Sequence, residues 1–160
     1  MNGPGENVSG DQRWMAVALE QARLAAAAGE VPIGAAIVID GELIAVAHNC
    51  VESLRDATAH AELLALRQAS GKLDRWRLLG AELFVTVEPC PMCVMGAVLA
   101  RVKRIVFGAP DLKFGGLGSR VDLLAGKVFN HRPDTTAGVL AADSAELLRE
   151  FFRERRRKVL

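Results

Sequence analysis

The sequence predicts an α/β protein, a three-layer α/β/α sandwich around a mixed central sheet of about five strands. Two observations carry this prediction. Apolar runs of strand length alternate with segments whose apolar residues recur at helical spacing. The strand region opens with the turn signal Asp40-Gly41, where both positions tolerate positive φ. The chain has 160 residues, 51% of them hydrophobic, which suits one well-filled domain.

In the first half of the chain, helical spacing and strand-length runs alternate. Asp11 is a plausible N-cap and Gly29 a plausible stop for the first helix. The Asp40-Gly41 turn joins two apolar runs into a hairpin. Leucines at helical spacing then predict another helix, which Gly71 ends. The expected elements are a helix to about Ala28, strands over 33–39 and 43–47, a polar loop over 48–58 and a helix over 59–70.

The second half continues the alternation around a glycine-rich segment. Pro91 suits the first turn of a helix, and Asp143 or Ser144 is a plausible cap for the last one. The expected elements are strands over 83–87, 104–107 and 136–140, helices over 91–100, 121–124 and from 143 to about 158, and a loop over 108–120.

Composition narrows the class of protein. No apolar run is long enough to span a bilayer, so we expect no membrane association. The first residues, MNGPGENVSG, lack the parts of a signal peptide. We expect residues 1–10 to be a disordered leader before a single domain over 11–160. Three cysteines without a secretion signal fit a reducing compartment, so the expected location is the cytoplasm.

Charge by itself does not indicate a nucleic-acid binder, because the net charge is only +1. The basic residues nevertheless gather near the C-terminus. A solvated helix end that complements the helix dipole explains this cluster at least as well as a binding surface does. The cluster consists of Arg153, Arg155, Arg156, Arg157 and Lys158.

Two short motifs together predict a metal site. Alone, the pair Cys90 and Cys93 could be half of a structural zinc site or a redox pair at a helix start. The sequence contains no second Cys-x-x-Cys motif, which excludes a Cys₄ site by count. His60 is the available third ligand. Three ligands leave the fourth position of Zn²⁺ open to water, the arrangement of catalytic zinc sites.

Glu62 gives this site its chemistry. It follows His60 by two residues at a helix start, so its carboxylate can approach a metal-activated water without binding the metal. It can then move protons between the water, a ring nitrogen and a leaving amine. The pattern His-x-Glu followed by Pro-Cys-x-x-Cys matches the signature of zinc nucleobase deaminases. Cys50 and His48 lack ligand-like spacing and are interpreted as structural.

Several segments resemble the bacterial tRNA-specific adenosine deaminases of the cytidine-deaminase-like superfamily. The likeness runs from about Arg13 to Arg156, and the zinc motif alone does not distinguish members of the superfamily. The segments that carry it are Val31-Pro32-Ile33-Gly34-Ala35, Asn49, Asp56 to Leu63, Val85 to Cys93, Val106-Phe107-Gly108-Ala109, Gly118-Ser119, Asn130-His131-Arg132 and Glu146 to Arg153.

The resemblance implies hydrolytic conversion of adenosine to inosine at the wobble position of a tRNA anticodon stem-loop. It also implies a homodimer with one Zn²⁺ per subunit, held by His60, Cys90 and Cys93, and Glu62 as the proton shuttle. Asn49 and the backbone of Ala61 would contact the target nucleoside. Val31, Pro32 and Ile33 would line the base pocket, and Asp111, Lys113, Asn130, His131 and Arg132 would lie near the RNA strand.

Three positions depart from the family pattern. Ala57 stands where proline is usual, and Ser144 lies in a segment that usually reads differently. Phe114 is bulky where small residues are commoner. Two alternatives therefore stay open: a deaminase of a free nucleobase or nucleoside, such as guanine or cytosine, and a zinc-stabilised scaffold without catalysis. Glu62 argues against the scaffold, because a structural site needs no carboxylate beside its open position.

Overall fold

A five-stranded mixed sheet forms the centre of the molecule. The computed structural model describes the backbone of residues 4–159 and the side chains of residues 10–159. The strands lie in the order β2-β1-β3-β4-β5, with β1 antiparallel to β2 and β3, and with β3, β4 and β5 mutually parallel. Their bounds are β1 Gly34–Ile39, β2 Glu42–His48, β3 Ala81–Val87, β4 Arg104–Ala109 and β5 Asp134–Thr136.

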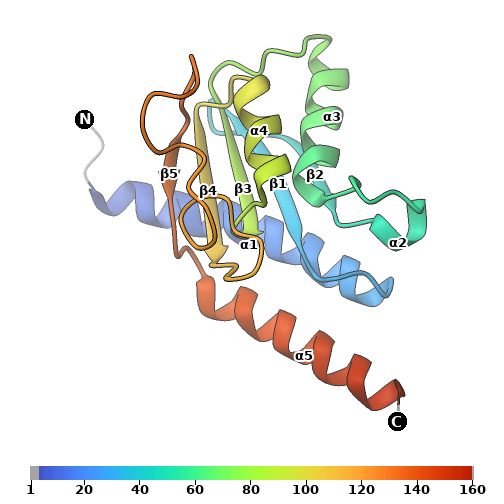
Figure 1. Cartoon of the computed structure of the whole chain (residues 1–160). Helices are drawn as coiled ribbons and strands as arrows, with labels where there is room; N and C mark the ends of the chain where they lie inside the picture. The colour runs from blue at the N-terminus through green and yellow to red at the C-terminus, as the bar shows by residue number, and fades with distance from the viewer. Residues whose placement is uncertain (1–3, 160) are drawn as a thin grey trace.

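Helices cover both faces of this sheet, as Figure 1 shows. One apolar cluster joins α1 to one face of the central strands, and α5 packs against β4 on that side. The larger cluster joins α3 and α4 to the other face. The predicted three-layer α/β/α architecture is therefore confirmed. The helices are α1 Pro4–Ala27, α2 Val51–Leu54, α3 Ala61–Leu73, α4 Pro91–Leu99 and α5 Ala141–Val159.

The first helix is longer than expected. It begins at Pro4, inside the segment for which we expect a leader, and residues 1–3 lie outside the described part of the chain. Asp11 does not cap it, so that prediction is wrong. Its carboxylate instead accepts hydrogen bonds of 2.6 and 2.9 Å from Arg104 at the start of β4. Asp11, which local propensity predicts to be an N-cap, therefore forms a long-range ion pair with Arg104 instead. The division of the chain into a leader and one domain stays a prediction.

Other boundaries differ from the sequence prediction because tertiary contacts extend or replace local signals. Gly71 does not end α3, which continues to Leu73 and stops at Asp74 in the left-handed conformation. A short helix, α2, interrupts the expected loop over 48–58. Residues 121–124 form turns and an isolated bridge to Leu117 instead of a helix. The last strand lies at 134–136 rather than 136–140, and α5 begins at Ala141, before either expected cap.

One edge of the sheet collects the segments that carry the predicted chemistry. The carboxyl ends of β3 and β4 meet there, together with the amino end of β1 and the carboxyl end of β2, because β1 is antiparallel to its neighbours. Helices α3 and α4 begin at the same edge, which places two helix N-termini side by side (Figure 1). On the other face, Gly34 allows α1 to pack closely on β1, since a Cβ there would collide with the backbone of Ala18 in α1. None of the described helices is long and apolar enough to cross a membrane.

Candidate metal centre and active site

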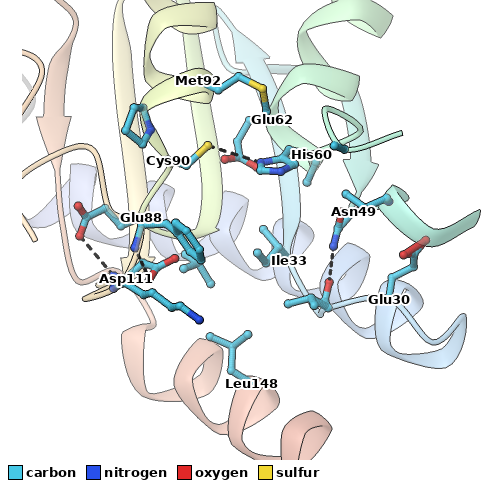
Figure 2. Close-up of a pocket in the computed structure, with 18 of the residues that line it drawn as sticks. Glu30, Ile33, Asn49, His60, Glu62, Glu88, Cys90, Met92, Asp111 and Leu148 are labelled. Atoms are coloured by element: carbon cyan, nitrogen blue, oxygen red, sulfur yellow. Dashed lines mark hydrogen bonds between the residues drawn. The ribbon is translucent and has the colours of Figure 1, made fainter. Parts of the chain in front are cut away.

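The three predicted metal ligands come from the starts of two helices. His60 is the N-cap residue of α3 and Cys90 that of α4, both with extended backbone. Cys93 lies in the first turn of α4 and is buried. Pro91 occupies the first turn, where its missing N–H costs no hydrogen bond. Extended cap residues turn their side chains toward the gap between the helices, and Figure 2 shows His60 and Cys90 facing each other there.

The donor atoms have the spacing of a tetrahedral metal site. Nδ1 of His60 lies 3.6 Å from Sγ of Cys90 and 3.5 Å from Sγ of Cys93, and the three donors lie within 4.8 Å of one another. Zn–S bonds of about 2.3 Å and a Zn–N bond of about 2.0 Å at tetrahedral angles give N···S edges of roughly 3.5 Å. The donor set therefore fits a Zn²⁺ ion with two thiolates, one imidazole and a fourth position free of protein ligands.

The two thiols differ in acidity. A hydrogen bond between their sulfur atoms, aided by the imidazole of His60, lowers the pKa of Cys90 to about 4. The same bond, together with burial, raises the pKa of Cys93. Because metal ligation requires thiolates, zinc binding to this pair is expected to be coupled to proton release.

Glu62 lies in the first turn of α3 and is only 4% exposed. Burial raises the pKa of its carboxyl, and the adjacent Cys90 thiolate raises it further, although bonds from its own backbone N–H and from Cys93 act against this. A carboxylate whose pKa is raised is a stronger base, and its acid form can return the proton in a later step. Figure 2 shows Glu62 beside His60, at the wall of the cavity described next.

A pocket of about 820 Å³ opens beside the metal ligands. Figure 2 shows Asn49 and Glu30 on one side of it, Glu88 and Asp111 on the other, and His60, Cys90 and Glu62 between them. Its size is in the range of small-molecule sites. Of the residues predicted to contact substrate, those that line it are Val31, Ile33, Asn49, Ala61, Asp111 and Lys113.

Pro32 and the segment 130–132 are not among the lining residues of this pocket. Nε2 of His131 lies 2.7 Å from the carbonyl oxygen of Val102, just before the amino end of β4. Arg132 lines a separate, smaller pocket. The length of β4 therefore separates His131 from the metal site of the same chain, and the contact of Asn130, His131 and Arg132 with RNA stays a prediction.

Asn49 is held by the backbone on both sides of its amide. Nδ2 donates to the carbonyl of Val31 at 3.3 Å, and Oδ1 accepts from the N–H of Val51 at the same distance. Each amide group has a second hydrogen or lone pair to offer, so Asn49 can contact a ligand while these bonds fix its orientation.

The loop before His60 keeps its shape without the proline that is usual in the family. Asp56 accepts hydrogen bonds from the N–H and the hydroxyl of Thr58, at 2.8 and 2.7 Å. This turn holds the backbone of Ala57 in place of a proline ring. The departure at Ala57 therefore leaves the approach to His60 ordered.

Two buried carboxylates shape the pocket walls, and sequence reasoning gave neither a role. Glu30 is 1% exposed and accepts hydrogen bonds from the N–H groups of Glu52 and Ser53, at 2.8 and 3.0 Å, and from the Ser53 hydroxyl. Burial raises the pKa of this carboxyl, but the bonds from Ser53 and Glu52 outweigh burial and lower it overall. Glu30 thus fastens α2, next to Asn49, as a remote N-cap.

Glu88 fastens the opposite wall. It is 4% exposed and accepts hydrogen bonds from the N–H groups of Asp111, Leu117 and Ser119 at 3.3, 3.0 and 3.2 Å, and from the Ser119 hydroxyl. The only sequence signal for this role is an acidic residue directly before Pro-Cys-x-x-Cys. Helix α5 adds Leu148, Phe152 and Arg155 to the lining of the pocket.

Fold and site together define a deaminase. The family model of the MafB19-like deaminases matches residues 9–156, so the chain belongs to that family. It is 47% identical over 148 residues to the tRNA-specific adenosine deaminase of Bacillus subtilis, with 92% of each chain covered. It is 44% identical over 151 residues to the enzyme of that name from Aquifex aeolicus, with 94% of this chain and 99% of the relative covered. Within the deaminases, the chain belongs to the tRNA-specific adenosine deaminase family.

Comparison with solved structures supports the same family, and one of the similar structures is a guanine deaminase. A structure from a study of A-to-I editing by tRNA:A34 deaminases matches with a TM-score of 0.82 and 43% identity, covering 85% of this chain and 99% of that one. A guanine deaminase from Nitrosomonas europaea matches with a TM-score of 0.76 and 30% identity, covering 94% of this chain and 85% of that one. The predicted family and the cytidine-deaminase-like fold are confirmed.

Proposed function

We propose that this protein hydrolyses adenosine to inosine at the wobble position of tRNA, using Zn²⁺ held by His60, Cys90 and Cys93. The single observation that carries the proposal is the donor triangle with its 3.5 and 3.6 Å edges beside the buried carboxyl of Glu62 in one pocket. The relatives at 44–47% identity that act on tRNA adenosine support the choice of substrate.

The protein's own groups divide the chemistry between them. Zn²⁺ bound to the three donors would supply Lewis acidity that lowers the pKa of a water toward neutrality. Glu62 receives a proton from the attacking water and passes it to N1 of the purine, and it delivers a second proton to the departing amine. Burial in the wall of the pocket raises the pKa of this carboxyl, which makes its carboxylate form a stronger base toward the water.

The pocket walls suit a purine that has left its stack. Val31 and Ile33 present apolar surface, and Asn49 presents an amide whose orientation two backbone bonds fix. Ala61 offers its backbone beside the reacting centre. A base in a double helix cannot reach such a site, whereas a wobble base in the anticodon loop can be turned outward. Asp111 and Lys113 line the pocket near the path of the strand, and Asn130, His131 and Arg132 are proposed to contact RNA beyond it.

The resemblance also supports two copies per functional enzyme, and we extend the proposal to a homodimer. Helix α4 is apolar, and Leu99 at its end is 56% exposed, which leaves surface for a second copy to cover. Mass measurement by light scattering tests this. A tRNA substrate supports a cytoplasmic location for the reaction.

A free nucleobase is the second candidate substrate, because the guanine deaminase neighbour has the same fold. The deciding experiment incubates the zinc-loaded protein with total tRNA, and scores inosine by sequencing, beside a parallel assay with free guanine and cytosine. We expect inosine at a wobble position, with activity that falls steeply as salt rises. Turnover of free guanine without inosine in tRNA would replace the proposal with the second candidate.

A further inference from the structure

Phe114 is an aromatic side chain that lines the active-site pocket and is nevertheless 59% exposed. The chain has no tyrosine, six phenylalanines and two tryptophans, so a ring left in water at this site is not explained by a surplus of aromatic residues. Its exposure places it at the open side of the pocket, where the rest of a polymeric substrate passes while one base occupies the interior.

The backbone holds Phe114 in a fixed position. Oδ1 of Asp111 accepts hydrogen bonds from the N–H groups of Lys113 and Phe114, both at 3.0 Å. The N–H of Gly115 closes the turn by donating to the carbonyl of Asp111 at 2.8 Å. Glu88 fastens this turn to the start of the metal-binding segment. A side chain on a preordered turn loses little backbone freedom when a ligand stacks on it.

The ammonium group of Lys113 places a positive charge beside the Phe114 ring. Nζ of Lys113 lies 5.4 Å from the centroid of the Phe114 ring. Arg155, from α5, adds a second cation to the same pocket. The carboxylates of Asp111 and Glu88 already accept backbone hydrogen bonds. An exposed ring beside a lysine that forms none of the ion pairs among the described residues is the combination that binds single-stranded nucleic acid, by stacking on the base and pairing with the phosphate.

We propose that Phe114 is a stacking platform for the unpaired base adjacent to the target adenosine, with Lys113 beside the adjoining phosphate. The proposal deepens the proposed function and rests on it. Turning the target base into the pocket removes a stacking partner from its neighbour, and Phe114 replaces that partner. Phe114 thereby contributes to selection among RNA sequences without touching the reacting atoms.

A double-mutant cycle between the protein and the RNA tests this. The probes are three anticodon stem-loop RNAs, one intact, one abasic on the 5′ side of the target and one abasic on the 3′ side. Binding is measured by fluorescence anisotropy with zinc-loaded full chain carrying Glu62→Ala, so that no turnover occurs. We expect Phe114→Ala to weaken binding of the intact RNA roughly 5- to 100-fold.

The decisive measurement is whether the binding losses caused by Phe114→Ala and by the abasic RNA depend on each other. We expect one of the two abasic RNAs to bind the Glu62→Ala protein more weakly by a similar factor, and Phe114→Ala to cause no further loss with that RNA. Multiplicative losses with both abasic RNAs would overturn the proposal. Inosine formation in the intact stem-loop by the unmutated chain separates the two proposals: without inosine both fail, and with inosine but no coupling only this one fails.

Three further variants keep the test specific. Phe114→Trp is expected to retain binding, and Phe114→Leu to lose most of it; a Leu variant that binds normally would mean apolar packing, not stacking. Trp76→Ala is the matched control, because Trp76 is also 59% exposed, lies 4.5 Å from a guanidinium and does not line the pocket. We expect its binding to be unchanged. A change of mass in solution for Phe114→Ala would assign the ring to contact between copies and overturn the proposal.

Discussion

Gly115 packs directly against the carboxylate of Glu88, and a Cβ at position 115 would collide with that carboxylate. Any residue other than glycine at this position would therefore displace one of the two. Through this contact the wall formed by 111–119 lies directly on the residue that precedes the Pro-Cys-x-x-Cys segment. The position of the substrate-facing loop and that of the metal ligands are therefore set by the same buried carboxylate.

Gly115→Ala is expected to displace this loop and raise KM for the RNA substrate, with kcat/KM lower by roughly 10- to 100-fold, because misplaced contacts weaken the productive complex. Steady-state kinetics on the stem-loop measures this. Gly71→Ala is the matched control: a Cβ there meets nothing within 4 Å, and alanine is the better helix former by about 1 kcal/mol. Unchanged kinetics in Gly115→Ala would contradict the role of the contact.

Glu62→Ala should abolish turnover while the metal and the fold remain. In the proposed mechanism the carboxyl moves protons without binding the metal, so activity should fall by about 10²-fold or more. Because Glu62 is buried with a raised pKa, its removal should not lower stability through loss of a charge. Inosine formation, metal content by mass spectrometry and thermal unfolding check the three statements. Inosine formation by Glu62→Ala at the native rate would contradict the proposed role of this carboxyl in proton transfer.

Serine variants of the three cysteines should differ clearly in the amount of zinc they bind. Cys90→Ser and Cys93→Ser each remove a donor of the triangle, and we expect loss of stoichiometric zinc. Cys50→Ser is the control, since the Cys50 thiol bonds only to the carbonyl of His48 at 3.2 Å. Chelation of the native protein should lower its unfolding temperature, because zinc at about 1,000 times its Kd stabilises by about 4 kcal/mol. Full zinc occupancy in Cys90→Ser would refute the ligand assignment.

Glu30 predicts an acid dependence of stability. Its folded pKa lies below the unfolded value, so the ionised carboxylate stabilises the native state above the unfolded pKa, near 4.5. That stabilisation is lost as pH falls through the folded pKa. Glu30→Gln keeps the shape but not the charge, and should be less stable than the native protein by about 2 kcal/mol at pH 7. Urea unfolding should show the difference shrinking below pH 4.5; a constant difference would contradict the assignment.

Ser144→Ala should be neutral or stabilising by up to about 1 kcal/mol, because the buried Ser144 hydroxyl has no hydrogen-bond partner among the described residues. Ser53→Ala is the matched control. Its hydroxyl donates to Glu30 at 2.9 Å, and its removal should destabilise by about 1 kcal/mol. Chemical denaturation of the two variants compares them directly. A Ser144→Ala protein that loses stability as Ser53→Ala does would indicate a hidden partner for the hydroxyl.

The metal ligands were predictable because they lie in short motifs whose spacing is set by local backbone geometry. Cys90 and Cys93 share one helical turn, and His60 precedes Glu62 by two residues at the start of another. The fold class followed from periodicity in the same way. Element ends were less predictable: Asp11 reads as a cap from its neighbours alone, and only its pairing with Arg104 gives it another role.

The sequence by itself determined the deaminase family and the candidate residues for its chemistry, the possible metal ligands His60, Cys90 and Cys93 and the carboxyl of Glu62, since each belongs to a local motif. Only the tertiary structure decided what surrounds that chemistry. Glu30 and Glu88 line the pocket and bond to segments that are far away in the chain. Phe152 and Arg155 of α5 line the same pocket. Such contacts depend on how the strands are ordered in the sheet, and no local pattern of residues encodes that order.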